Sequence, residues 1–166
     1  MHSQIENIHG VTIAAKPKRH DQRGWFLPAI GNDDPHPDWI LQNISQSEPG
    51  VLRGMHYQDP HPQSKLLTVI EGTLQDIVAD LRPDSPTYGK YAVYHLAADG
   101  KNQLHIPKGC AHGFLVTGDS PALISYLADS PYLPESEKTL PWNHPDWNFP
   151  WLTDSPILSQ KDQEEK

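Results

Sequence analysis

The sequence predicts an all-β fold, a sandwich or barrel of short strands, and three observations support this. Seventeen prolines are spread over the 166 residues, and proline both breaks the helical hydrogen-bond ladder and constrains the residue before it. The segments between the prolines are rich in β-branched and apolar residues, and Gly/Pro turn clusters separate them. Short strands at regular spacing between such turns are typical of sandwiches and barrels.

The strands are expected in the following order. Residues 65–81 (KLLTVIEGTLQDIVADL) form two apolar runs interrupted at Glu71-Gly72, which we interpret as a hairpin corner. Further strands are predicted over 91–96, 103–106, 113–116 and 122–127, with turns at RPDSPTYG, AADGKN, PKGCAHG and TGDSP. The polar run QKDQEEK, residues 160–166, predicts a frayed end.

Length and composition predict one domain over residues 1–166. The presence of only one cysteine fits a reducing compartment. The net charge of -8, from 13 basic and 21 acidic residues, argues against nucleic-acid or anionic-membrane partners. A lone cysteine, Cys110, excludes an intramolecular disulfide. Because no apolar run resembles a signal peptide or reaches the ~18 residues of a membrane span, we expect a soluble, cytoplasmic protein.

Two segments contain polar residues that a plain strand or turn does not require. In GVLRGMHYQ, residues 50–58, Arg53 and His56 are three apart and would face opposite sides of a strand unless Gly54 introduces a bulge. The alternative is an edge strand with a surface arginine and an incidental histidine. In IPKGCAHGF, residues 106–114, we expect a loop that carries His112 between two strands. With ten histidines in the chain, His112 could equally be a solvated loop residue.

These segments carry a family resemblance. GVLRGMHYQ, then QSKLLTVIEGTLQDIVADLRPDSPTYGK, then QLHIPKGCAHGFLV resemble the dTDP-4-dehydrorhamnose 3,5-epimerase family of cupins in wording, order and spacing. DQRGWF, SYLADSPYLPESE and ILSQKD fall where that family has counterparts, so the resemblance covers roughly residues 15–162. It implies a cupin-type jelly-roll β-barrel with short flanking helices or turns and an active site inside its open end. It also implies a homodimer that needs no metal or other cofactor.

The implied reaction inverts the carbons that flank the ketone of a dTDP-linked 4-keto-6-deoxy sugar. Such carbons are weak acids, so inversion needs a base, stabilisation of the enolate and an acid on the opposite face. By the resemblance, His56 is the base, Asp162 its dyad partner and Tyr126 the proton donor. A histidine suits the role of base because its ordinary pKa lies near neutral pH. Lys65 would stabilise the enolate charge.

The residues alone also permit plainer interpretations of these positions. Asp162 could be a solvated acid in a charged tail, Tyr126 a core tyrosine and Lys65 an edge-strand lysine. Asp76 lies in the apolar run LQDIVAD, where a carboxylate needs a partner. We expect it to support the substrate site from behind Lys65 or Tyr126.

Substrate binding is expected from a second set of residues. Arginine suits bidentate contacts to a diphosphate, and an aromatic face suits stacking on the base. The resemblance assigns the diphosphate to two arginines, sugar or nucleotide contacts to polar residues and base stacking to a tyrosine: Arg23, Arg53, Gln42, Asn43, His112, Glu137 and Tyr132.

The sequence departs from the family pattern on the recognition side. DQRGWFLP places Pro28 where the family has an acid that contacts the nucleotide, and Leu41 stands where glutamine is usual. The identity of the sugar nucleotide is therefore less constrained than the chemistry. Three tryptophans in PWNHPDWNFPW, Trp142, Trp147 and Trp151, are expected to form a packed lid on the barrel.

Other activities remain open at this point. A metal-dependent cupin would present two histidines two residues apart, whereas Tyr57 and Gln58 follow His56. A non-catalytic sugar-binding cupin would need neither the base nor the acid. Within the family, epimerisation at C3 alone or C5 alone, or ketoisomerisation of another nucleotide sugar, would use the same residue types.

Overall fold

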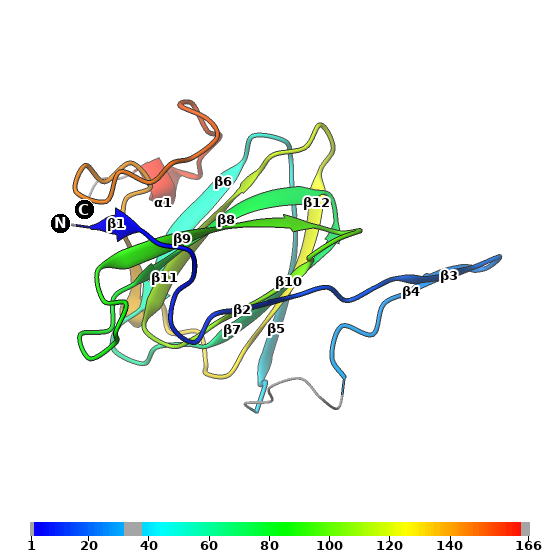
Figure 1. Ribbon diagram of the computed structural model, residues 1–166, viewed down its shortest axis with the longest axis horizontal. Coiled ribbons are helices and arrows are strands. Elements are labelled where there is room, and N and C mark those ends of the chain that lie inside the picture. The colour runs from blue at the N-terminus through cyan, green and yellow to red at the C-terminus, as the bar shows by residue number, and fades with distance from the viewer. Residues whose placement is uncertain (1, 32–37, 164–166) are drawn as a thin grey trace.

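The computed structural model describes residues 2–31 and 38–163. Its strands form a six-stranded sheet, a five-stranded sheet and a separate two-stranded hairpin (Figure 1). The prediction of an all-β, jelly-roll fold is confirmed. Among the described residues no helix is long and apolar enough to cross a membrane.

The six-stranded sheet has the order β1-β9-β8-β11-β6-β13. In chain order its strands are β1 (Ser3–Gln4), β6 (Leu52–Gln58), β8 (Thr73–Asp80), β9 (Lys90–Ala97), β11 (Cys110–Val116) and β13 (Glu137–Thr139). The five-stranded sheet has the order β2-β10-β7-β12-β5. Its strands are β2 (Thr12–Ala14), β5 (Leu41–Ser47), β7 (Lys65–Glu71), β10 (Gln103–Ile106) and β12 (Ala122–Ala128). The helical elements of the described residues are a 3-10 turn at Pro134–Ser136 and one helical turn, α1 (Gln160–Gln163).

The main core lies between the two large sheets. Residues of β8 alternate, so Leu74 and Val78 join the cluster between the sheets while Ile77 and Ala79 belong to a second cluster. This alternation follows from the two-residue period of a strand. It also turns Asp76, which shares its face with Leu74 and Val78, toward the barrel interior.

The tryptophan-rich segment covers the outer face of the six-stranded sheet. Trp147 and Phe149 are buried against Tyr91 and Ile77, and Phe149 meets Tyr91 edge to face at 5.1 Å between ring centroids. Gln75, on the same face, donates to the carbonyl oxygen of Pro150. The segment is packed, as expected, but it does not form a lid over the cavity. It lies on the outer face of the sheet because the apolar residues there, on β8 and β9, would otherwise be exposed to water.

Gly72 marks a corner between sheets. β7 pairs with β10 and β12, whereas β8 pairs with β9 and β11, so the two strands that flank Gly72 do not pair with each other. The interpretation of Glu71-Gly72 as a hairpin corner is wrong for this reason. Both runs are apolar because each is an inner strand of a different sheet. Two strands of a buried hairpin would be equally apolar, so the pattern alone does not separate the two arrangements.

An irregularity in β6 brings Arg53 and His56 to the same side. In the pairing of β6 with β11, His56 is opposite His112 and Arg53 is opposite Phe114, so three residues of β6 span two of β11. Gly54 has φ 117°, and a Cβ there would lie 2.6 Å from the Cα of Gly113. The irregularity that Arg53 and His56 need in order to share a side is therefore present, and the glycines let the two backbones approach.

His112 lies in a strand. The loop after β10 is confined to residues 107–109, and β11 begins at Cys110. Our loop over 106–114 is wrong, because Gly113 allows the close approach to Gly54 and is not part of a turn. The frayed end predicted from residue 160 is also wrong for 160–163, which form α1 with Asp162 buried; residues 164–166 lie outside the described part.

The hairpin of β3 (Arg19–Asp21) and β4 (Gly24–Phe26) projects away from the barrel (Figure 1). All six of its strand residues are exposed, among them Trp25 and Phe26 at 46% and 64%. An exposed pair of large aromatic side chains is unusual for an isolated hairpin.

Candidate active site

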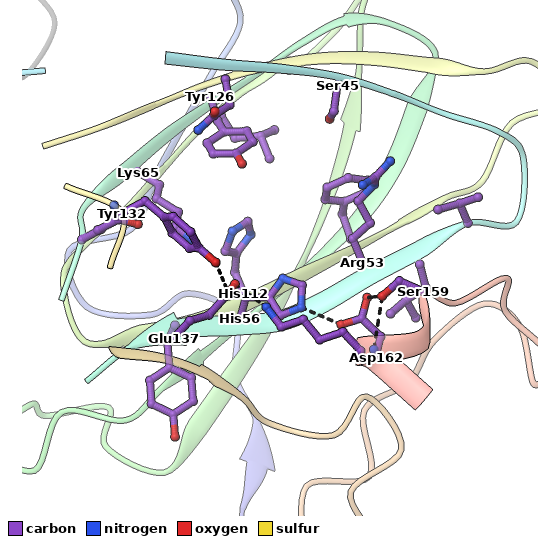
Figure 2. Close-up of a pocket in the computed structure, with 18 of the residues that line it drawn as sticks. Ser45, Arg53, His56, Lys65, His112, Tyr126, Tyr132, Glu137, Ser159 and Asp162 are labelled. Atoms are coloured by element: carbon purple, nitrogen blue, oxygen red, sulfur yellow. Dashed lines mark hydrogen bonds and ion pairs between the residues drawn. The ribbon is translucent and has the colours of Figure 1, made fainter. Parts of the chain in front are cut away.

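A cavity of about 770 Å³ opens between the two large sheets. It is bounded by β5, β6, β7, β11 and β12, by the segment around β13 and by the C-terminal segment that includes α1. The cavity brings together most of the predicted site residues, from segments far apart in the chain. Those labelled in Figure 2 are Arg53, His56, Lys65, His112, Tyr126, Tyr132, Glu137 and Asp162. Asn43 also lines the cavity.

His56 and Asp162 form a hydrogen-bonded dyad. Nε2 of His56 lies 2.6 Å from Oδ1 of Asp162, whose side chain is only 2% exposed. Burial by itself would raise the pKa of Asp162, but hydrogen bonds from His56, Ser159 and the Gly54 backbone outweigh it and hold that pKa below its usual value. An ionised carboxylate can only accept, so Nε2 of His56 is the donor in this bond and Nδ1 is the ring nitrogen that the dyad leaves unused.

Lys65, Asp76 and His112 lie together in the interior. Burial lowers the pKa of Lys65 to about 8, partly offset by the charges of Asp76 and Glu137. Burial also raises the pKa of Asp76 well above its usual range, against the pull of Lys65. The pKa of His112 is lowered well below its ordinary value by burial and by the charges of Lys65 and His56, so His112 is neutral. Its Nδ1 has a long contact of 3.4 Å with Oδ2 of Asp76.

Tyr126 stands across the cavity from the dyad. It comes from β12 of the five-stranded sheet, whereas His56 comes from β6 of the six-stranded sheet, and Figure 2 shows the two side chains on opposite sides. Burial raises the pKa of the Tyr126 phenol, so its hydroxyl is protonated at neutral pH. A base and a protonated acid on opposite walls are what inversion at a carbon requires.

Arg53 is held at the cavity by β5. Its Nε donates to Oγ of Ser47 at 2.9 Å, and its Nη2 donates to the carbonyl oxygen of Gln46 at 3.4 Å. These bonds leave the guanidinium with further N–H groups for an anion. Asn43, on β5, also lines the cavity.

Tyr132, Glu137 and Lys161 form a chain of contacts at the cavity wall. The Tyr132 hydroxyl donates to Oε2 of Glu137 at 2.6 Å, and Nζ of Lys161 lies 2.5 Å from Oε1. Burial would raise the pKa of Glu137, but the bonds from Lys161 and Tyr132 outweigh it and lower that pKa. The bond to Glu137 raises the pKa of Tyr132 to about 12.

Two predicted residues lie outside the cavity, and Asp76 lies behind its wall. Arg23 is on the projecting hairpin, where its side chain is 85% exposed and paired with Asp21. Gln42 points to the outer side of β5 and donates to Oγ of Ser125. Asp76 is fully buried next to His112, and its role in supporting Lys65 or Tyr126 stays a prediction. Of the positions that depart from the family pattern, Leu41 lines the cavity and Pro28 does not.

Sequence reasoning missed two side chains of the C-terminal segment, Ser159 and Lys161. The Ser159 hydroxyl donates to Oδ2 of Asp162 at 2.9 Å, and the backbone N–H of Asp162 donates back to the same hydroxyl oxygen at 3.2 Å. Serine followed three residues later by an acid is the spacing of a helix cap, so SQKD carried a signal for an ordered turn. Lys161 had no such signal, because its partner Glu137 is distant in the chain.

Metal ligands do not gather in the described part of the chain, since no three His, Cys, Asp or Glu side chains there could hold an ion together. A histidine bonded to a buried carboxylate, a phenol on the opposite wall and a half-buried lysine in the same cavity define an enzyme that moves protons on a bound small molecule.

The comparisons with known proteins identify the family. The family model described as dTDP-4-dehydrorhamnose 3,5-epimerase matches residues 6–166. The dTDP-4-dehydrorhamnose 3,5-epimerase of Methanothermobacter thermautotrophicus is 33% identical over 165 residues, covering 95% of this chain and 89% of the relative. The enzyme of the same name from Neisseria gonorrhoeae is 43% identical over 140 residues, which cover 84% of this chain; the match spans only 41% of that relative's length.

Solved structures agree. The crystal structure of dTDP-4-dehydrorhamnose 3,5-epimerase from Bacillus anthracis, with TDP and pyrophosphate bound, superposes with a TM-score of 0.86 at 33% identity. The superposition covers 95% of this chain and 94% of the other. The chain belongs to the dTDP-4-dehydrorhamnose 3,5-epimerase family and is an isomerase, as the resemblance implied.

Proposed function

We propose that the protein epimerises a dTDP-linked 4-keto-6-deoxy sugar at C3 and C5, with His56 as base and Tyr126 as acid. Family membership supports the reaction. The single observation that carries the assignment of roles is the 2.6 Å bond between His56 and the buried carboxylate of Asp162, on the wall opposite Tyr126.

The reaction begins when Nδ1 of His56 removes the proton from a carbon beside the ketone. Asp162 fixes the ring by accepting from Nε2–H and stabilises the imidazolium that forms, a role that suits an ionised, buried carboxylate. The ammonium of Lys65 stabilises the enolate oxygen, and such preorganised charge is usually the largest contribution to catalysis. Tyr126 then delivers a proton to the opposite face, which inverts the carbon.

The nucleotide end is proposed to lie along Arg53, Tyr132 and Glu137, with Asn43 and His112 on the sugar. Arg53 is restrained by Ser47, so it presents its donors to the diphosphate with little loss of side-chain entropy. Tyr132 is 51% exposed at the cavity and offers a ring face for the base.

We also propose a homodimer in which each projecting hairpin reaches the partner's cavity. Arg23 is expected to bind the diphosphate, yet its own hairpin carries it away from the cavity of the same chain. A second copy would reconcile the expected role of Arg23 with its position and would cover Trp25 and Phe26, which are exposed in the single chain. A cytoplasmic location fits the free, buried Cys110.

The first experiment is NMR of the protein with dTDP-4-keto-6-deoxyglucose in deuterated water. We expect deuterium at both C3 and C5. His56→Ala should abolish exchange at both carbons, because it removes the base; retained exchange would refute that role. Deuterium at one carbon only would replace double epimerisation by single-site epimerisation. Dialysis against EDTA is expected to leave exchange unchanged, and its loss would favour a metal-dependent mechanism.

A further inference from the structure

The C-terminal segment that carries Asp162 has little structure of its own. Within the described residues, its last backbone–backbone link to the barrel is at Ile157, which bonds to Leu52 and Gly50. Beyond it, α1 is a single turn of four residues. A helix this short is unstable in isolation, since helix formation has a costly nucleus. The place of Asp162 opposite His56 must therefore come from contacts of side chains after Ile157.

Those contacts are few. The Asp162 carboxylate itself is bonded to His56 and to the backbone N–H of Gly54, both on β6. Ser159 bonds to Asp162 but belongs to the same segment and moves with it. Among the described residues, the ion pair of Lys161 with Glu137 is the polar side-chain link from α1 to the barrel that does not involve Asp162 itself. Lys161 is adjacent to Asp162, so a tether on one directly limits the motion of the other.

Glu137 is a firm anchor for this tether. It lies on β13, in register with Gln58 of β6, and its side chain is 20% exposed. Oε1 pairs with Lys161 while Oε2 accepts from the Tyr132 hydroxyl. Both carboxylate oxygens are thus committed, which restrains Glu137 on the cavity wall.

We infer that Lys161 is a positioning residue, which holds α1 to β13 through Glu137 and so keeps Asp162 on Nε2 of His56. The inference rests on the proposed function in one respect, because the position of Asp162 matters for the reaction only if His56 is the base. It also connects the nucleotide end to the base, since Tyr132 and Lys161 share the same carboxylate.

The test compares Lys161→Met with Lys138→Met. Lys138 follows Glu137 on β13 and pairs with Asp59 outside the cavity, so it offers the same substitution on an ion pair that touches no site residue. We expect Lys161→Met to lower kcat about fivefold, the size that a half-exposed ion pair supports, with KM unchanged. Lys161→Arg should restore kcat, and Lys138→Met should match the wild type.

A second measurement needs no substrate. The proton in the His56–Asp162 hydrogen bond is expected as a resolved downfield NMR signal in the wild type and in Lys138→Met, and to broaden in Lys161→Met. A sharp signal with unchanged kcat in Lys161→Met would overturn the inference, and a raised KM at unchanged kcat would make Lys161 a substrate ligand instead. If the wild type fails to exchange deuterium, the proposed function falls, while the NMR signal still decides the role of Lys161.

Discussion

Single buried charges set the working range of this site. In the proposed mechanism Lys65 stabilises the enolate only as an ammonium, and burial has brought its pKa down to about 8. At pH 7 most of the lysine is still charged. The charge is lost as the pH rises through about 8, well before an exposed lysine would lose it, so the environment that strengthens the interaction also limits its pH range.

The pH dependence of kcat/KM tests this assignment. We expect activity to fall about tenfold per pH unit above about 8. Lys65→Arg should move this alkaline limit upward, because the guanidinium does not deprotonate, at a lower plateau caused by its different shape. Tyr126→Phe is the control, because the Tyr126 phenol is another cavity group with a high pKa. This variant should keep the alkaline limit of kcat/KM near pH 8. An unchanged limit in Lys65→Arg would assign it to another group.

The positions of individual cavity residues were predictable where short motifs carry them. His56, Lys65 and Tyr126 lie in segments whose wording is specific, and the structure brings all three to the cavity. Asp162 was predictable only through resemblance, because burial of a carboxylate next to the lysine and glutamines of SQKDQ depends on a partner more than a hundred positions away. Lys161 could not be predicted, since a lysine in a polar tail is ordinarily solvated.

At the level of elements, the pairing of β6 with β11 depends on two glycines. A Cβ on Gly54 would lie 2.6 Å from Cα of Gly113 and 2.8 Å from the carbonyl oxygen of His112, and these backbone atoms cannot move aside cheaply. The same pairing places His56 opposite His112. Strand–strand contact and the position of His56 therefore depend on the same two glycines.

Gly54→Ala is expected to destabilise the fold more than Gly24→Ala. Both glycines have positive φ, 117° and 129°, but a Cβ on Gly24 meets nothing within 4 Å. Gly24→Ala should thus cost only backbone strain, about 1–3 kcal/mol at most. Gly54→Ala adds the overlap with β11. Urea unfolding of both variants measures the difference in the free energy of unfolding. Equal losses would mean that β6 and β11 can move apart to accept the extra Cβ without cost.

The outer aromatic cluster is a stability element that is separate from the cavity. Trp147 is 5% exposed against Tyr91 and Phe149, and truncating a buried tryptophan typically costs about 3–5 kcal/mol. Trp147→Ala should lower the free energy of unfolding by this amount, measured in urea. Its kcat at a temperature where it remains folded should stay near that of the wild type. A lid over the cavity would instead lose activity.

Strand positions were more predictable than strand partners. The apolar runs over 65–81 mark β7 and β8 correctly, yet only the structure places them in different sheets. The alternation of apolar and polar residues indicates which face of a strand is buried, but it does not indicate which strands lie beside it. The strands β2 to β5 were missed, because they are short or polar and half of β5 faces outward.

For the whole molecule, the proposed exchange of hairpins between two chains makes a quantitative prediction. Each cavity would use His56 of its own chain and Arg23 of the partner. Mixing inactive His56→Ala and Arg23→Ala chains, with unfolding and refolding to exchange subunits, then creates heterodimers with one intact site. About a quarter of the wild-type activity should return by this symmetry argument. If no activity returned, either Arg23 does not act in the partner's site or the protein is not a dimer.

We further propose that the chain is one domain, because its strands interleave. Neighbours in the sheets are distant in sequence, as in β1 with β9, β2 with β10, β5 with β12 and β6 with β13. Such a domain cannot be divided at any linker without separating paired strands.

That interleaving also governs how the protein becomes an enzyme during folding. Non-local strand pairs must close long loops before any contact repays the lost entropy, and folds of this kind typically take milliseconds to seconds. The cavity draws its walls from both sheets and from α1, so no partly folded chain holds a complete site. On refolding, the return of catalysis therefore reports the end of the process, after both sheets have formed and the C-terminal turn has docked.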